Sequence, residues 1–161
     1  IVAATFGKIR IVCAYVPNGQ SVGSDKYRYK IEWLRALRNW LEEEKKKYPY
    51  LALLGDYNIA PEDRDVYDPV AWAGNVLVSA FRALLDIGLV DAFRLFEQPE
   101  KSYSWWDYRQ LAFPRNRGLR LDHILLSGKL ASLCSACTID RQPRKWKQPS
   151  DHTPVIAELD L

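Results

Sequence analysis

Two polar side chains follow an apolar run near the first third of the chain. The run Leu-Ala-Leu-Leu over 51–54 breaks at Gly55, and Asp56 and Asn58 come directly after it. A short apolar run bounded by a turn signal predicts a buried strand, and α/β sheets bind ligands beyond the carboxyl ends of their strands. Asp56 and Asn58 are therefore predicted to face a functional rim, although a simple Asx-turn would use the same residue types.

Two further clusters each place a histidine directly after an aspartate. Asp122 interrupts an apolar stretch over 119–126, where a buried carboxylate is costly unless it is paired or bound to a cation. Asp151 and His152 come just before the last apolar stretch of the chain. Asp–His neighbours also arise by coincidence in turns, so the residue types alone leave both interpretations open.

Brought together, these side chains would offer mostly oxygen ligands with one imidazole. Hard oxygen donors select Mg²⁺ or Mn²⁺ over metals that prefer thiolates, and Mg²⁺ is usually shared with a substrate phosphate. In phosphodiester hydrolysis a carboxylate or metal-bound hydroxide provides the attacking oxygen, and an imidazolium hydrogen-bonds the phosphate. The residues that cover these roles are Asp56, Asn58, Asp122, Asp151 and His152.

Positive charge is concentrated in the last part of the chain. Residues 1–100 carry 13 Lys/Arg and 14 Asp/Glu, whereas residues 101–161 carry 10 and 6. Two stretches there contain basic residues and no acid, with Arg109, Arg115, Arg117 and Arg120 in the first and Arg141, Arg144, Lys145 and Lys147 in the second. This placement suits a polyanion such as a nucleic-acid backbone, although a solvated protein face would carry the same charges.

Composition excludes several classes of protein. The 161 residues are 48 % hydrophobic and 27 % charged, which is typical of one globular domain. No apolar run approaches the roughly 18 residues of a membrane span and the start lacks a basic n-region, so a cytoplasmic protein is favoured. A single CxxC at 134–137 gives little support for a metal or redox role. The chain has no methionine, and we expect it to be part of a longer or processed protein.

Strands that end beside one another must position the polar residues. Apolar residues over 8–16 predict an interior strand that stops at the turn signal Pro-Asn-Gly over 17–19. Apolar side chains at helical spacing over 24–47 predict an amphipathic helix before the strand over 51–54, and a second helix is predicted over 79–87. Further strands are predicted over 102–106, 119–126, 133–139 and 155–159. This order indicates one α/β unit.

Six motifs, in this order along the chain, resemble the exonuclease III family of AP endonucleases within the endonuclease/exonuclease/phosphatase superfamily. They are AYVPNG at 14–19, LGDYNI at 54–59, GLVDAFR at 88–94, SWWDYR at 104–109, NRGLRLDH at 116–123 and SDHTPV at 150–155. The GDxN and SDHxP elements fit the wider superfamily, including phosphatases and sphingomyelinases. The WWDYR and NRGLRLD stretches narrow the resemblance to the DNA-repair branch.

The resemblance implies a two-sheet α/β sandwich of the DNase I-like type. It implies a Mg²⁺-dependent (or Mn²⁺-dependent) enzyme that cuts duplex DNA 5′ to an abasic site, with 3′→5′ exonuclease and 3′-phosphatase activity. It further implies that the complete protein is a monomer that acts on double-stranded DNA with abasic sites or 3′ ends.

Family position also implies roles for individual residues. The catalytic set is Tyr15, Asp56, Asn58, Asp122 and His152, and the metal set is Asp56, Asn58, Asp151 and His152. Tyr15 and His152 resemble the groups that contact the phosphate, and Asp56 resembles the carboxylate that transfers a proton. Weaker DNA contacts are implied at Asn18 and Arg109. Trp105 resembles the aromatic side chain at the abasic pocket, with plain core packing as the alternative.

The chain also departs from the family pattern. The family begins with a strand that bears a Trp-Asn pair, followed later by a Gln-Glu pair whose glutamate is a principal Mg²⁺ ligand. Residues 1–161 contain neither motif. We therefore expect residues 1–161 to be the C-terminal two-thirds of the domain, with exposed sheet edges and apolar surface. The segment 76–81 is also shorter than the family pattern.

These departures leave other functions open. A catalytically impaired DNA-binding fragment would keep the basic stretches without the glutamate ligand. A phosphatase or phosphodiesterase acting on a small molecule or lipid would keep the GDxN and SDHxP elements, but the basic stretches and the WWDYR motif disfavour it. We expect the 161-residue chain alone to be weakly active or inactive.

Overall fold

The computed structural model of the chain describes residues 1–72 and 77–161. Its strands are β1 (Val2–Phe6), β2 (Ile9–Cys13), β3 (Tyr50–Asp56), β4 (Leu89–Asp91), β5 (Asp122–Ser127), β6 (Cys134–Ile139) and β7 (Val155–Leu159). Its α-helices are α1 (Asp25–Lys47), α2 (Pro69–Trp72), α3 (Leu77–Asp86) and α4 (Gly128–Ala131). Short 3₁₀ helices are η1 (Asp63–Asp65), η2 (Ala92–Leu95) and η3 (Gln142–Lys145).

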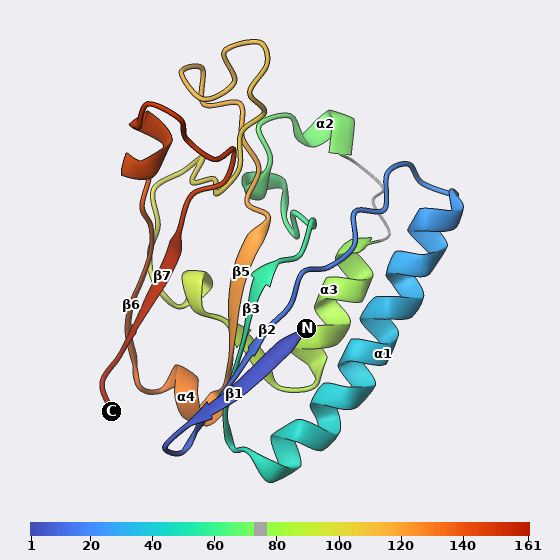
Figure 1. Ribbon diagram of the computed structural model, residues 1–161, viewed down its shortest axis with the longest axis vertical. Coiled ribbons are helices and arrows are strands. Elements are labelled where there is room, and N and C mark those ends of the chain that lie inside the picture. The colour runs from blue at the N-terminus through green and yellow to red at the C-terminus, as the bar shows by residue number, and fades with distance from the viewer. Residues whose placement is uncertain (73–76) are drawn as a thin grey trace.

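The strands form two sheets, as the sandwich prediction requires. The larger sheet has five strands in the order β1-β2-β3-β5-β4, in which β2 and β3 are parallel and β3 and β5 are antiparallel. The smaller sheet is the antiparallel pair β6-β7. In Figure 1, α1 and α3 lie on one side of the larger sheet and β6-β7 lie on the other. The fold class is confirmed, and no helix in the described parts of the chain is long and apolar enough to cross a membrane.

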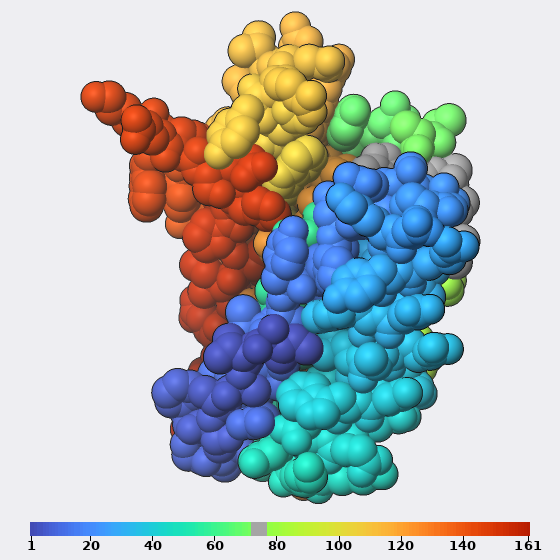
Figure 2. All heavy atoms as spheres, turned by 45° about the vertical axis from the view of Figure 1, so that its right-hand side comes forward, coloured from blue at the N-terminus to red at the C-terminus, as the bar shows by residue number. Residues whose placement is uncertain are grey.

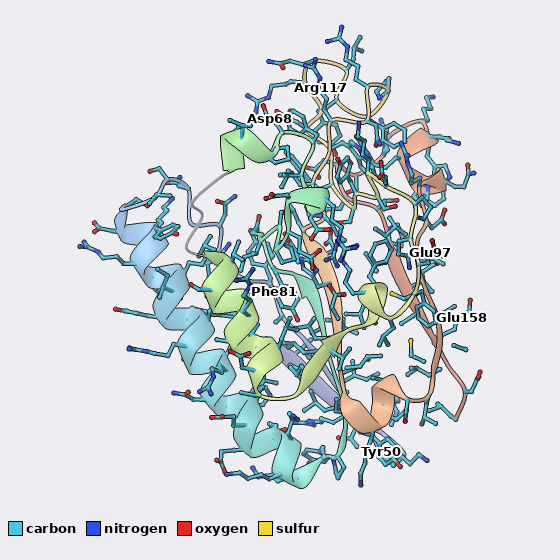
Figure 3. The ribbon with its side chains drawn as sticks, turned by 180° about the vertical axis from the view of Figure 1, so that it is seen from behind. Tyr50, Asp68, Phe81, Glu97, Arg117 and Glu158 are labelled. Atoms are coloured by element: carbon cyan, nitrogen blue, oxygen red, sulfur yellow. The ribbon has the colours of Figure 1, made fainter. Side chains whose placement is uncertain are left out.

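The helical face of the larger sheet holds the main core. Helix α1 begins after Ser24, whose hydroxyl accepts a hydrogen bond from the Tyr27 N–H, and such a cap satisfies a donor that the first helical turn leaves free. Leu41 of α1 and Phe81 of α3 pack with Leu53 of β3 in one buried cluster. Figure 3 shows Phe81 on α3 beside the sheet. The helices thus anchor the strands whose ends carry Asp56 and Asp122.

The opposite face of the larger sheet packs on β6-β7. Ala52 and Leu126 share a buried cluster there with Cys137. Burial and the neighbouring Cys134 raise the pKa of Cys137 to about 12, so its thiol stays protonated and both cysteines of the CxxC are free.

Some predicted elements differ from the structure. Residues 102–106 are not a strand, because their backbone pairs with distant segments through isolated bridges at Trp105 rather than with one neighbouring strand. The strand predicted over 119–126 begins at Asp122. Val76 of the shortened segment 76–81 lies outside the described residues, and Leu77 begins α3. The expected apolar edge is present, since Phe6 of the edge strand β1 is 65 % exposed.

Candidate active site

The two strand-end aspartates lie side by side. Asp56 is the last residue of β3 and pairs in register with Asp122, the first residue of β5. His152 lies against both, with Nδ1 at 2.9 Å from Asp122 Oδ2 and Nε2 at 3.8 Å from Asp56 Oδ2. The predicted convergence of these three residues, which are far apart in sequence, is therefore confirmed.

Asn58 is held in the left-handed region (φ 50°) beside Asp56. Its N–H donates to Asp56 Oδ1 at 2.8 Å, so the Asx-turn considered from sequence is present as well. Its side-chain Nδ2 donates to Val16 O and to Asp56 Oδ2, each at 3.1 Å. These bonds direct the amide nitrogen toward the protein and leave the amide oxygen as the atom that could meet a ligand.

Gly55 allows the chain to pass close to β2 just before the aspartate. It has φ +135°, and a Cβ built there would lie 2.0 Å from Ala14 O. Ala14 N–H donates to Leu54 O at 2.9 Å, which continues the β2–β3 pairing beyond β2. Any other residue at 55 would clash with this backbone, so the glycine is required where Asp56 leaves the strand.

Lys30 is a site residue that sequence reasoning missed. It is 1 % exposed on α1, and its Nζ donates to Asn58 O at 2.7 Å. Burial lowers the pKa of Lys30 to about 8, against the opposing effect of Asp56. A signal was present, because Lys30 falls on the same buried helical stripe as Tyr27 and Leu34, where a lysine requires a polar partner.

The charged groups of the site alter one another's protonation. Burial raises the pKa of Asp56, and the neighbouring Asp122 raises it further, while the Asn58 N–H, His152 and Lys30 oppose the change. Burial alone would lower the pKa of His152, but its hydrogen bond to Asp122 and the charges of Asp122 and Asp56 raise it. The two aspartates therefore stabilise the protonated form of His152.

The donor set fits a hard divalent cation. One ligand atom each from Asp56, Asp122 and His152 lie within 4.8 Å of one another, and these three form the possible metal group found among the described residues. Two adjacent carboxylates repel each other, and a cation between them would remove that cost. Asp151 Oδ2 accepts a hydrogen bond from Trp105 Nε1 at 2.9 Å, and the ligand role predicted for Asp151 stays a prediction.

A cavity of about 860 Å³ opens in front of these groups. The predicted residues that line it are Tyr15, Asn18, Asp56, Asn58, Trp105, Arg109, Asp151 and His152. Tyr15 is 64 % exposed. Trp105 also packs on a buried cluster that includes Leu119, so cavity lining and core packing are both true of this side chain. Arg109 is paired with Asp107 at 2.6 Å.

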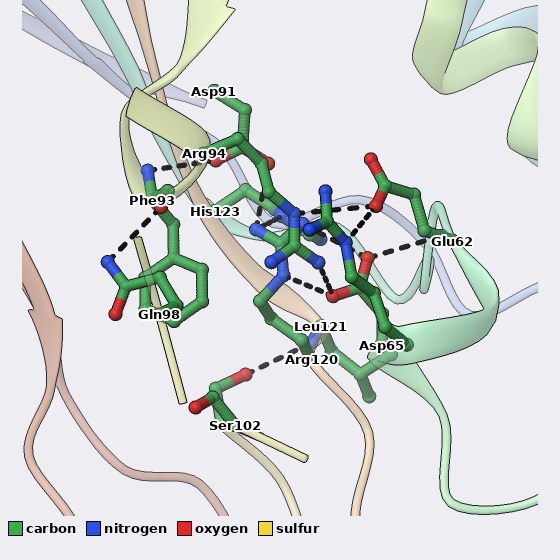
Figure 4. A network of polar contacts seen from close by, with 12 residues as sticks. Glu62, Asp65, Asp91, Phe93, Arg94, Gln98, Ser102, Arg120, Leu121 and His123 are labelled. Carbon is green, nitrogen blue, oxygen red and sulfur yellow. Dashed lines mark hydrogen bonds and ion pairs between the residues drawn. The ribbon is translucent and has the colours of Figure 1, made fainter. Parts of the chain in front are cut away.

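A buried ionic network lies behind the site (Figure 4). Arg120 is 1 % exposed; its Nε is 2.7 Å from Asp65 Oδ1 and its Nη1 is 2.8 Å from Asp91 Oδ2. Arg94 Nη2 also donates to Asp65. The prediction of a basic surface is wrong for Arg120, whose charge is paired with buried carboxylates. It is also wrong for Arg144, which is 6 % exposed.

The first histidine of the chain is part of this network. His123 Nε2 lies 2.8 Å from Ile59 O, and its Nδ1 lies 3.0 Å from Arg120 Nη1. Burial and the charge of Arg120 lower the pKa of His123 to about 3, so the ring is neutral. His123 thereby ties β5 to the loop that carries Asn58 and has a positioning role, unlike His152.

Comparison with known proteins agrees with this geometry. The chain is 36 % identical to Exodeoxyribonuclease III of Haemophilus influenzae, over 96 % of this chain and 62 % of that protein. It matches the structure of NExo, a 3′ phosphatase from Neisseria bound to a product DNA hairpin, with TM-score 0.95 and 40 % identity, over 99 % of this chain and 64 % of that one. An AP endonuclease from Archaeoglobus fulgidus matches with TM-score 0.92 and 34 % identity over the same shares.

These matches bear out the resemblance to exonuclease III enzymes, and the chain spans less than two thirds of the length of each of these relatives. The sequence model of the Endonuclease/Exonuclease/phosphatase family matches residues 2–152, which include every strand except β7. On that match, and on a fold shared with solved members, the chain belongs to the endonuclease/exonuclease/phosphatase family.

Proposed function

We propose that this chain forms the hydrolytic site of a metal-dependent DNA-repair nuclease of the exonuclease III type. The observation that carries the proposal is the meeting of Asp56, Asp122 and His152, because Asp56 and His152 of this group line one open cavity. Trp105 and Arg109 line the same cavity, and an aromatic ring with a guanidinium suits a nucleic-acid strand. Relatives named as an exodeoxyribonuclease, an AP endonuclease and a 3′ phosphatase support the same reaction class.

The chain's own oxygen atoms would hold Mg²⁺ or Mn²⁺. Asp56, Asp122 and the Asn58 amide oxygen are the nearest donors, with Asp151 and His152 at the same cavity. A bound divalent cation would offset the negative charge that develops on the phosphate in the transition state. Since the protein supplies hard oxygen donors at this position, Zn²⁺-type thiolate chemistry does not fit.

Each remaining group has a role that its environment suits. Burial raises the pKa of Asp56, which brings this carboxylate closer to the range in which it accepts a proton from an attacking water. His152, as the imidazolium, donates from Nε2 to a phosphate oxygen while Asp122 holds Nδ1. The exposed Tyr15 lines the same cavity, and its hydroxyl would donate to the same phosphate.

The proposed substrate is duplex DNA with abasic sites or 3′ ends. Trp105 would contact the deoxyribose at a position without a base, where no base competes for the space. Asn18 and Arg109 line the same cavity and would contact the backbone on either side. The proposed contacts are mostly with phosphates and not with base edges. Such contacts suit an enzyme that recognises a lesion or a strand end instead of a sequence.

The test compares three substrates with Mg²⁺ present: a duplex with one abasic site, a duplex with a 3′-phosphate, and a soluble phosphomonoester. With residues 1–161 assayed within the complete protein, the expected result is cleavage of DNA that requires Mg²⁺ and is lost in His152→Ala, with no turnover of the phosphomonoester. A faster reaction of the small phosphomonoester would contradict the proposal and favour a small-molecule phosphatase. Salt-sensitive DNA binding without any product would favour a non-catalytic DNA-binding module.

A further inference from the structure

The segment 141–148 carries charge and an aromatic ring that the proposed site does not use. Trp146 is 67 % exposed and stands between Lys145 and Lys147, which are also exposed. No acidic residue occurs between Asp140 and Asp151. In Figure 2 this red segment projects from the molecule beside the yellow residues of the loop that follows η2. We call residues 141–148 the η3 ridge.

The base of the η3 ridge is fixed to the loop that lines the cavity. Arg144 is the buried residue of the η3 ridge, and its guanidinium carbon lies 5.5 Å from the Tyr108 ring centroid and 5.0 Å from the Phe113 ring centroid. The same side chain donates to Ser150 O and, at 3.4 Å, to Trp106 O. A buried guanidinium in contact with aromatic rings and carbonyls stabilises the position of the segment. The exposed Trp146 therefore lies on an ordered part of the surface.

The η3 ridge lies close to the hydrolytic groups along the chain. Ser150, which accepts from Arg144, is two residues before His152. Trp146 is six positions before His152 in the sequence, which limits the distance between their Cα atoms to about 21 Å. That upper limit corresponds to roughly six base pairs of duplex at 3.4 Å per step.

We propose that the η3 ridge is a second contact surface for the DNA strand, outside the cavity. Lys145 and Lys147 contact phosphates, and Trp146 stacks on a sugar or base within about six base pairs of the hydrolysed bond. The inference rests on the proposed nuclease function, because the strand must occupy the cavity to reach the ridge. Exposed lysines on both sides of an exposed tryptophan suit a polyanion with stacking faces better than an apolar partner.

The experiment measures equilibrium binding of a fluorescent 30-base-pair duplex with a central tetrahydrofuran abasic analogue, by anisotropy in EDTA so that nothing is cleaved. The variants are Trp146→Ala and the pair Lys145→Ala with Lys147→Ala. The control is Trp40→Ala, because Trp40 is also exposed (37 %) but lies on α1. Equal urea unfolding midpoints ensure that all variants are folded.

We expect Trp146→Ala to weaken binding about tenfold, from the stacking of one aromatic ring. Replacing both lysines should reduce the slope of the logarithm of the binding constant against the logarithm of the salt concentration by about 1.8. That change corresponds to the loss of two phosphate contacts. Trp40→Ala should bind as the unmodified chain does. If the unmodified chain binds and every variant binds equally, the η3 ridge proposal is overturned while the nuclease proposal stands. If the unmodified chain binds polyglutamate but no duplex, both are overturned.

Discussion

Replacing Arg120 tests whether the buried network supports the site. Arg120→Met keeps most of the aliphatic volume and removes the guanidinium. Asp65 and Asp91, which are 1 % and 6 % exposed, then lose their bonds of 2.7 and 2.8 Å, and the contact with His123 Nδ1 at 3.0 Å is lost as well. The two carboxylates keep their charge inside the protein, where water cannot replace the lost partner.

The expected cost follows from this geometry. Removing one partner of a buried ion pair typically lowers the free energy of unfolding by about 3–5 kcal/mol. Arg94 remains bonded to Asp65, which limits the loss at that carboxylate and leaves Asp91 as the main unpaired charge. A domain has about 5–15 kcal/mol of stability in all, so the variant should fold but unfold at a much lower urea concentration.

The assay is urea unfolding followed by tryptophan fluorescence. The control is Arg115→Met, because Arg115 is exposed and such changes usually stay within about 0.5 kcal/mol. A triple variant, Arg120→Met with Asp65→Asn and Asp91→Asn, should recover part of the loss, since no buried charge is left unpaired. A loss below about 1 kcal/mol in Arg120→Met would refute the reasoning that this network holds β4, β5 and η1 together.

Three further predictions concern single side chains. Because the pKa of His123 is lowered to about 3, its protonation favours the unfolded chain; stability is full above pH 6.5 and falls by about 2 kcal/mol at pH 5. In urea unfolding at pH 7 and pH 5, His123→Gln should show a weaker pH dependence than the unmodified chain, and an equal dependence would contradict this. His152→Ala and Asp151→Asn should each slow DNA cleavage by about 100-fold or more in initial-rate assays, with little change in the urea unfolding midpoint. A strongly lowered midpoint would assign the lost activity to misfolding instead. Trp105→Ala should reduce the ratio of kcat/KM for abasic over intact duplex more than it reduces kcat, and an unchanged ratio would assign Trp105 to packing alone.

Local patterns predicted the elements whose signal lies within a few residues. The long helix over 24–47 and the strands over 51–54, 133–139 and 155–159 follow from their own periodicity and appear close to the expected bounds. The motif residues Asp56 and His152 were expected to converge, and their 3.8 Å separation bears this out. This succeeded because strand ends and turn signals are encoded locally.

What sequence reasoning missed depends on partners from elsewhere in the chain. Residues 102–106 have the aromatic composition of a strand, yet Ser104 N–H donates to Leu119 O and Ser104 O accepts from the Thr153 N–H. These bonds link two segments instead of forming one ladder. Sequence reasoning predicted Arg120 to lie on a charged surface, because nothing within a few residues of it shows that Asp65 and Asp91 enclose it.

The central claim is that Asp56 and Asp122 hold one divalent cation beside His152, and Mn²⁺ binding measured by isothermal titration calorimetry tests it most directly. The control is Asp25→Asn, because Asp25 is an exposed carboxylate at the start of α1. The account predicts Mn²⁺ binding that Mg²⁺ competes with, that Asp25→Asn keeps, and that Asp56→Asn weakens by roughly tenfold or more. Equal Mn²⁺ affinity in Asp56→Asn and the unmodified chain would contradict it.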